Sequence, residues 1–305
     1  MPGGLSSRLG RLLDVAYTIE YGGESSVQSS LNMLYLLAYS GQGQMRIFGP
    51  SNEKYHVRGG NEQITDRMAS VLGDQVRLGT QLVALARNTD STWTVTTRSG
   101  GLASSQVADH VVLALPFSLL RTVDLSKARF PALKRTAIDQ LPMGTNSKLQ
   151  LQFTDRHWRP LGGNGDSFAD TGYQSTWEVT RAQPGTRGIL VDYTGGRIGA
   201  RFGPATTAAD YARRFLAQID PVLPGLAAKW NGKVTLDSWK EHPWTRGSYS
   251  YWKVGQYTAF SGVESEPVGT CHFAGEHTSQ DFQGYLNGAV ETGQRAAAEI
   301  LAALK

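Results

Sequence analysis

The strongest structural signal in this sequence is Gly269-Thr270-Cys271-His272-Phe273-Ala274-Gly275-Glu276-His277, a short apolar run that ends in Gly-Glu. It is followed by Phe282-Gln283-Gly284-Tyr285-Leu286-Asn287-Gly288-Ala289, which leads into a helix expected from about 286 to the C-terminus. Gly275 lets a backbone approach a ligand closely, and Glu276 can accept hydrogen bonds from hydroxyl groups. The helix N-terminus offers N–H groups and partial positive charge to an electron-rich ligand edge. An ordinary strand–loop–helix is the alternative interpretation.

The expected C-terminal helix repeats small and apolar residues at helical spacing, which predicts one buried face. The positions on that face are Val290, Gly293, Ala297, Ile300 and Leu304.

The composition indicates a globular protein and argues against several kinds of partner and metal site. At 305 residues the chain can form one large domain or two interleaved ones. With 40% hydrophobic and 18% charged residues it is expected to be globular. The net charge of +4 is small and the basic residues are spread out, which argues against nucleic acid as a partner. Cys271 is the only cysteine, so thiolate metal clusters are excluded, and the histidine spacing does not predict a metal site.

The sequence contains no apolar run of about 18 residues that would span a membrane. Its first residues lack the basic-then-apolar pattern of a signal peptide. By default we therefore expect a cytoplasmic location and no membrane partner.

Helices are expected at residues 5–17 and 26–38, with a glycine-containing break at 40–44. Asn61 is a candidate N-cap for a helix over 62–72. Strands are expected at 76–78, 82–86, 93–97 and 110–115. The last of these is continuously apolar, as buried parallel strands are. This order of elements predicts one flank of a doubly wound sheet.

The region from 138 to 240 has a different character. Strands are expected at 148–153, 188–193 and 234–239, and a helix at 208–219. We interpret this region as a mixed sheet packed with helices, separate from the α/β passage. The fold class is therefore α/β with α+β features.

The block from Phe273 to Gly293 closely resembles the C-terminal motif of flavin-containing monoamine oxidases. Three further segments match that family in the expected order. Arg246-Gly247-Ser248-Tyr249-Ser250 resembles the loop beside the isoalloxazine ring, and Met143-Gly144-Thr145-Asn146-Ser147-Lys148 resembles the strand that bears the active-site lysine. Leu82-Val83 lies where the family contacts the adenine. The resemblance runs through essentially the whole chain and is nearest to bacterial oxidases of small primary amines.

The resemblance implies an FAD-binding doubly wound domain interleaved with a substrate domain. Substrate-domain segments would be 1–50 and 138–240, and FAD-domain segments 51–137 and 241–305. The implied cofactor contacts are Val83, Trp239, Ser248, Gly275, Glu276, Gly284, Tyr285 and Leu286. Glu276 would accept from ribityl or ribose hydroxyls, and Trp239 would pack at the flavin edge unless it is a core tryptophan. Ser248 stands where some relatives carry a flavin-linked cysteine, so FAD is expected to be bound non-covalently.

The same resemblance implies three catalytic residues. Tyr249 and Tyr285 would form an aromatic pair that sandwiches the substrate amine before the flavin, although both could instead be core tyrosines. Lys148 would hold a water near flavin N5 and assist reoxidation by dioxygen, although a lysine in an alternating strand is often a solvated-face residue. The implied reaction is oxidative deamination of a primary amine with dioxygen as acceptor.

Members of this family begin with a strand–GxGxxG–helix unit that binds the pyrophosphate, and this sequence has none. One hypothesis is that the Rossmann half belongs to another polypeptide or to a longer gene, so that the chain acts with a complementing partner. Association into a homo-oligomer is a further possibility, because an uncovered sheet edge favours pairing. The alternative hypothesis is a pseudoenzyme or interaction protein that retains the substrate fold without FAD.

Overall fold

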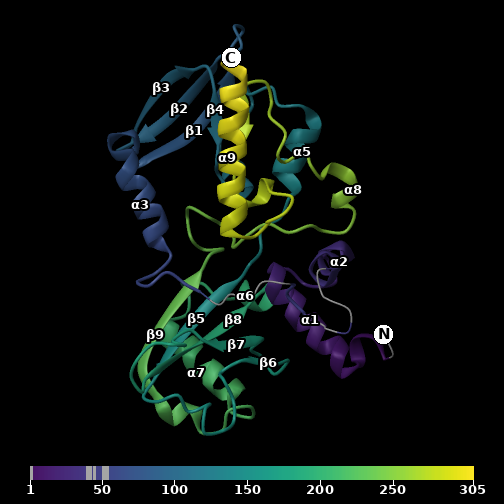
Figure 1. The fold of residues 1–305 in the computed structure, drawn as a ribbon, viewed down its shortest axis with the longest axis vertical. Coiled ribbons are helices and arrows are strands. Elements are labelled where there is room, and N and C mark those ends of the chain that lie inside the picture. The colour runs from purple at the N-terminus through teal and green to yellow at the C-terminus, as the bar shows by residue number, and fades with distance from the viewer. Residues whose placement is uncertain (1–2, 39–42, 44–45, 50–54) are drawn as a thin grey trace.

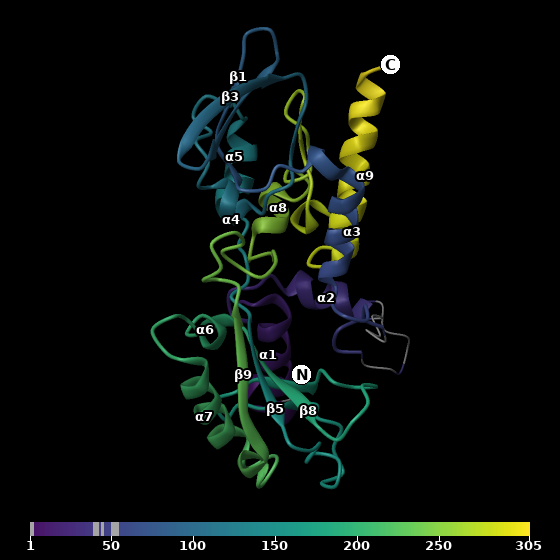
Figure 2. The ribbon, with the colours of Figure 1, turned by 90° about the vertical axis from the view of Figure 1, so that its left-hand side faces the viewer.

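The computed structural model describes residues 3–38, 43, 46–49 and 55–305. Figure 1 shows two lobes, one above the other. The upper lobe contains residues 55–140 and 250–305, and the lower lobe contains residues 147–240. Two N-terminal helices, α1 (Arg8–Tyr21) and α2 (Ser30–Ala38), lie beside them, and α2 is at the level of the junction in both Figure 1 and Figure 2.

Capping decides where α1 begins and ends. The Ser7 side chain accepts a hydrogen bond from the Gly10 N–H, and Gly22 ends the helix with a φ of 68°. The helix is therefore displaced from the predicted 5–17. The second helix begins at Ser30 and not at 26, because Gln28 pairs with Lys253 in a β-bridge. Of the predicted break at 40–44, only Gly43 lies within the described residues.

The upper lobe contains two separate sheets. Strands β1 (Thr80–Arg87), β2 (Trp93–Ser99) and β3 (Leu102–Ala108) form an antiparallel meander. Strands β4 (Val111–Leu113) and β10 (Cys271–Phe273) form a parallel pair. The α/β fold class is confirmed, but the hairpin strands do not join the parallel sheet as the sequence analysis expects.

The helices of the upper lobe are α3 (Glu62–Leu72), α4 (Phe117–Leu120), α5 (Ala132–Gln140), α8 (Gln256–Phe260) and α9 (Leu286–Ala303). In Figure 1, α9 lies beside the parallel pair, α5 and α8 lie to its right, and α3 lies below the meander.

Two local predictions in the upper lobe are wrong. Residues 76–78 form no strand, because a 3-10 helix at Gly73–Gln75 leads into a turn. Asn61 makes no side-chain cap for α3, since its Oδ1 accepts from the Val57 N–H instead.

The buried face of α9 is also not the predicted one. Gly288, Thr292 and Ala296 are buried, whereas Val290 is 53% exposed and Leu304 is 68% exposed. A close approach explains this choice, because a Cβ on Gly288 would lie 2.3 Å from the Phe282 carbonyl oxygen. Small residues therefore face the protein and the larger apolar residues face outward.

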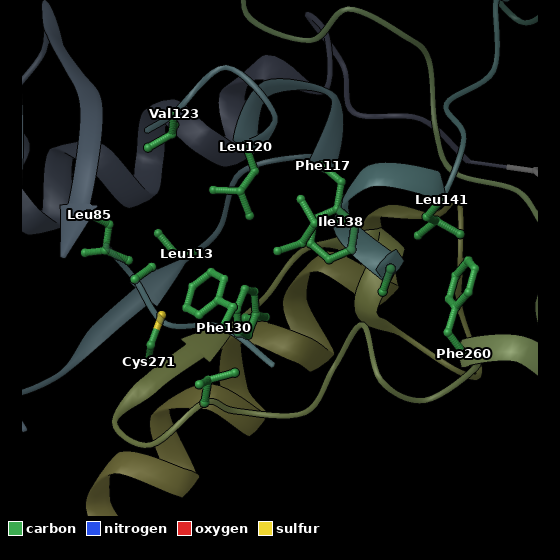
Figure 3. Packing of buried hydrophobic residues seen from close by; sticks show 14 of the residues in the cluster. Leu85, Leu113, Phe117, Leu120, Val123, Phe130, Ile138, Leu141, Phe260 and Cys271 are labelled. Carbon is green, nitrogen blue, oxygen red and sulfur yellow. The ribbon is translucent and has the colours of Figure 1, made fainter. Parts of the chain in front are cut away.

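A continuous apolar core supports the β4–β10 pair. Figure 3 shows Leu113 and Cys271 from the two strands beside Phe117 and Phe130. The core also holds a lysine, Lys134, whose Nζ lies 4.0 Å from the centroid of the Phe273 ring. Burial lowers the pKa of Lys134 to about 8. This core fixes β10, and therefore the start of the Gly-Glu segment.

The lower lobe is a five-stranded sheet of order β6-β7-β8-β5-β9, covered on one face by α7 (Ala208–Ile219). Its strands and its short helix α6 are Ser147–Phe153 (β5), Ser167–Phe168 (β6), Ser175–Glu178 (β7), Gly188–Thr194 (β8), Gly196–Gly199 (α6) and Trp230–Ser238 (β9). Every pairing is antiparallel, where a mixed sheet is expected from the sequence. The reason is that β5 lies between β8 and β9 and runs opposite to both.

Successive side chains of a strand point to opposite faces of the sheet, and this alternation separates the core side of the lower-lobe sheet from its other side. Leu149, Leu151 and Phe153 of β5 are buried in the core beneath α7. Lys148 therefore projects from the opposite face, with its cross-strand neighbour Tyr193.

Asp192 is buried in the lower lobe, and its Oδ1 has no hydrogen-bond partner. Burial raises its pKa to about 8. In the unfolded chain the carboxyl ionises near pH 4, so this residue makes folding less favourable as pH rises from about 4 to about 8. We expect Asp192→Asn to remove that slope and to gain about 4 kcal/mol near pH 7. Urea unfolding across this pH range measures it.

The control for this substitution is Asp237→Asn, which changes an exposed carboxylate on β9. Parallel pH slopes for the Asp192→Asn variant and the unsubstituted protein would contradict the assignment.

Within the described ranges, no helix combines the length and apolarity that crossing a bilayer requires.

Candidate active site

A cavity of about 1220 Å³ lies where the two lobes and the N-terminal helices meet. Its wall combines segments far apart in the sequence. They include Ile19 of α1, Lys148 of β5, Trp177 of β7, Tyr193 of β8, Tyr249, and Gly284 with Tyr285 at the start of α9. Ligand pockets commonly measure about 300–1,000 Å³. The space is therefore large enough for a cofactor ring with a small substrate.

Lys148 enters this cavity through an aromatic box. Its Nζ lies 5.7 Å from the ring centroid of Trp177, 5.6 Å from that of Tyr193 and 5.5 Å from that of Trp239. An ammonium at these distances is attracted to the electron-rich ring faces. Lys148 is half-buried among these rings, so the solvated-face alternative does not describe it. Trp239, directly after β9, supplies the third ring.

Tyr249 is held by its hydroxyl group. Its oxygen lies 2.6 Å from the Tyr193 hydroxyl and donates to the Ile19 carbonyl at 3.2 Å. Burial raises the pKa of Tyr249 well above its usual 10, and the neighbouring Tyr193 and Glu20 add to this effect. The phenol is therefore neutral across the physiological range and presents an uncharged, electron-rich ring.

Tyr285 lines the same cavity and is the N-cap residue of α9. The Tyr285 side chain makes no cap hydrogen bond, and its carbonyl accepts from the Gly288 N–H at 3.1 Å, which leaves the N–H groups of Leu286 and Asn287 unoccupied by the cap residue. Such a helix end attracts an electron-rich group. Gly284 also lines the cavity, whereas Leu286 is 62% exposed and is not part of the lining.

The Glu276 carboxylate is bound by three protein donors. Its Oε1 accepts from the Ser250 N–H at 2.9 Å. Its Oε2 accepts from the Ser250 hydroxyl at 2.9 Å and from the Gly284 N–H at 2.8 Å. A carboxylate offers about four acceptor positions, so one is left for a ligand hydroxyl. In this structure Glu276 ties the segment around Tyr249 to the start of α9.

Gly275 is required by its own surroundings. Its φ is 122°, and a Cβ there would lie 2.7 Å from the His277 ring. Burial lowers the pKa of His277 to about 3, so the imidazole is neutral above that pH. The glycine therefore allows a buried histidine to fold back beneath the Gly-Glu turn.

Six of the eight predicted cofactor contacts lie outside the cavity lining, namely Val83, Trp239, Ser248, Gly275, Glu276 and Leu286. Ser248 donates its hydroxyl hydrogen to Asn146 Oδ1 at 2.6 Å. Val83 lies in the upper lobe at a register shift between Leu82 and Ala84 of β1. Such a bulge places one residue out of the ladder and often re-aims it beside a ligand.

Sequence reasoning missed two members of the site, Trp177 and Tyr193. Neither lies in a motif. The available signal was strand register, because Tyr193 pairs directly with Lys148 and therefore shares its face. Trp177 lies diagonally across from Tyr193, and their ring centroids are 5.1 Å apart.

Over the described ranges, no group of three or more histidine, cysteine or acidic side chains is placed to hold a metal ion.

Comparison with known proteins identifies the family. The family model for flavin-containing amine oxidoreductases matches residues 4–301. A flavin-containing amine oxidase of Danio rerio is 27% identical over 292 residues, which cover 92% of this chain and 54% of the relative. An L-amino acid dehydrogenase of Synechocystis is 28% identical over 292 residues, covering 92% of this chain and 57% of that protein.

Solved structures support the fold. A cyclohexylamine oxidase from Brevibacterium oxydans aligns with a TM-score of 0.79 at 24% identity, over 98% of this chain and 65% of that one. Wild-type putrescine oxidase bound to putrescine aligns with a TM-score of 0.76 at 24% identity, over 95% of this chain and 64% of that one.

The chain belongs to the flavin-containing amine oxidoreductases, whose cofactor is FAD. It spans about half the length of the curated relatives that it matches.

The site fits the ring end of FAD. The start of α9 and the rings of Tyr249 and Tyr285 line the cavity, and Glu276, bonded to the lining residue Gly284, has one acceptor position left; a flavin ring and its ribityl chain can use these groups. Ser248 has no thiol to form a thioether with the ring, in keeping with non-covalent FAD.

Proposed function

We propose that this chain carries the substrate site and the flavin-ring site of an oxidase that deaminates a small primary amine with dioxygen as acceptor. The products would be an imine that hydrolyses to an aldehyde, ammonia and hydrogen peroxide. One observation carries the proposal: Lys148, Tyr249 and Tyr285, from three distant segments, line one cavity at the uncapped start of α9.

The two tyrosines would orient the amine. Tyr249 and Tyr285 come from distant segments and both line the cavity. Two electron-rich rings would direct a substrate nitrogen between them. FAD supplies the redox chemistry when bound, as the acceptor of a hydride equivalent from the substrate carbon.

Lys148 would hold a water molecule beside the site at which dioxygen reacts. Its position among Trp177, Tyr193 and Trp239 keeps the ammonium in the cavity wall. The rings also replace part of the water around the ammonium, which strengthens the effect of its positive charge.

Five of the remaining predicted contacts lie in the upper lobe, and Ser248 lies just before its second segment. We propose that the upper lobe is the FAD domain, where Val83 meets the adenine, and that the lower lobe is the substrate domain. Gly275, Glu276 and Gly284 would serve the ribityl chain, with Ser248 and Leu286 near the ring.

The pyrophosphate needs a further element. We propose that a strand–GxGxxG–helix unit completes the FAD domain at the β4–β10 pair, between the exposed faces of α3 and α9. Helix α3 has no buried residue, and Ile64, Met68 and Val71 on it are 41%, 50% and 73% exposed. On α9, Val290 and Leu301 are 53% and 62% exposed. Such faces are typical of surfaces that pack against another element.

Co-expression tests this function. We expect the chain together with a GxGxxG-bearing unit to purify with a flavin spectrum and to release peroxide with benzylamine or cyclohexylamine. The matched control is the same unit with its glycines replaced, which should yield colourless, inactive protein. Flavin bound by the intact pair with no amine oxidised would contradict the proposal and favour a non-catalytic protein.

A further inference from the structure

Tyr193 occupies a central place in the cavity. On the sheet it lies opposite Lys148 of β5 and Ser175 of β7. Its ring meets Trp177 at 5.1 Å between centroids and at an interplanar angle of 69°. The Lys148 ammonium also lies over the Tyr193 ring, 5.6 Å from its centroid. The Tyr193 ring therefore has both Trp177 and Lys148 as neighbours.

The Tyr193 hydroxyl takes part in a directed chain of hydrogen bonds. A phenol has one proton to donate. Tyr249 donates to the Ile19 carbonyl at 3.2 Å, so the proton in the 2.6 Å contact comes from Tyr193. The order is therefore Tyr193 to Tyr249 to the backbone of α1.

Both ends of this series of hydrogen bonds are held in place by the fold. Ile19 is buried, and its carbonyl also accepts from Asn146 Nδ2 at 2.6 Å. Tyr193 lies near the end of β8 and is paired with a strand on each side, β5 and β7. Tyr249, in contrast, lies on a segment with little regular structure, after Gly247 and before an isolated bridge at Ser250. The Tyr249 carbonyl accepts from the Gly144 N–H at 2.7 Å, and its hydroxyl contacts hold the other end of the side chain.

We propose that Tyr193 is a positioning residue for amine oxidation, which holds the ring of Tyr249 in the orientation that faces the substrate nitrogen. This inference rests on the proposed function. Tyr193 acts through Tyr249, so its loss should slow the reductive half-reaction. It should not slow reoxidation, because Lys148 contacts the Tyr193 ring and not its hydroxyl group.

The test is Tyr193→Phe in the flavin-loaded complex, with benzylamine as the probe. A lost hydrogen bond of ordinary strength corresponds to a change of about 3- to 10-fold. We expect the rate constant for flavin reduction at saturating amine to fall by that factor. The rate constant for reoxidation should remain within about 2-fold. A general loss of structure would lower flavin content or change both constants together.

Tyr173→Phe is the matched control, because it removes a buried tyrosine hydroxyl on the core side of the same sheet, where Tyr173 bonds to Ser167 at 3.0 Å. It should leave flavin reduction unchanged. Equal reduction rates in Tyr193→Phe and in the unsubstituted complex would overturn the positioning role, as would equal slowing in both variants. Absence of turnover in the unsubstituted complex would instead reject the proposed function.

Discussion

Replacing Lys148 with methionine is expected to slow the reaction of the reduced flavin with dioxygen by about 100-fold. Positioned acids and fixed charges typically contribute about 10²- to 10⁴-fold to such steps. Methionine keeps the length of the side chain and makes favourable contacts with aromatic rings, so the box formed by Trp177, Tyr193 and Trp239 should persist. Reduction by the amine should stay within about 3-fold, because the tyrosine pair is intact.

Stopped-flow mixing of the reduced, flavin-loaded complex with oxygenated buffer measures this rate constant. Lys233→Met is the control, since it removes an exposed lysine of β9 outside the cavity. Reoxidation at the same rate in the Lys148→Met variant and the unsubstituted complex would show that the ammonium has no part in the oxygen reaction.

The second large effect is expected for Glu178→Gln, which should lower the free energy of unfolding by about 3 kcal/mol. Glu178 and Arg156 form a buried ion pair, with side chains 2% and 7% exposed. Glu178 also accepts from Trp158 Nε1 at 2.9 Å and from the Thr180 hydroxyl at 3.0 Å. Removing one partner of such a pair typically costs about 3–5 kcal/mol, because the other charge is left buried.

The pKa of Glu178 is consistent with this arrangement. Burial acts to raise it, but the hydrogen bonds from Arg156, Trp158 and Thr180 together hold it below its usual range. A lowered pKa in the folded state means that the stabilisation is present at neutral pH and is lost as pH falls.

Urea unfolding at neutral pH measures the loss, and a fall in Tm of about 6–10 °C should accompany it. Asp155→Asn is the control, because its ion pair with Lys229 is about 40% exposed on both sides and should contribute less than about 1 kcal/mol. A change of less than about 1 kcal/mol for Glu178→Gln would contradict the structural account of this pair.

The local periodicity of apolar residues was sufficient to predict several helices and strands. The alternation over residues 148–153 predicts β5, and the spacing over 208–219 predicts α7, whose bounds agree with the structure. The apolar run before Pro116 predicts a parallel strand, and β4 does pair in parallel with β10. These elements are specified by periodicity within a few residues, so a single sequence contains the necessary information.

Long-range packing was the part that local pattern could not predict. The buried face of α9 is set by close approach to Phe282 and not by its larger apolar residues. The hydroxyl contact between Tyr193 and Tyr249 joins residues that are 56 positions apart. The buried Asp192 and Lys134 break the rule that charged residues lie outside, and no short motif marks such exceptions.

For the same reason, only part of the candidate site could be predicted from the sequence. Lys148, Tyr249 and Tyr285 lie in segments that resemble family motifs, and the structure brings them to one cavity. Trp177 and Tyr193 lie in ordinary strands, and only the register of the sheet places them there. The roles of all five residues in catalysis are proposals.

The central claim is that this chain holds the amine against a flavin ring. Anaerobic addition of benzylamine to the flavin-loaded complex tests it most directly. We expect loss of the visible flavin absorption with release of one ammonia per flavin after hydrolysis, and a return of the absorption when oxygen is admitted. A complex that binds flavin but keeps it oxidised with benzylamine, cyclohexylamine and putrescine would contradict the account.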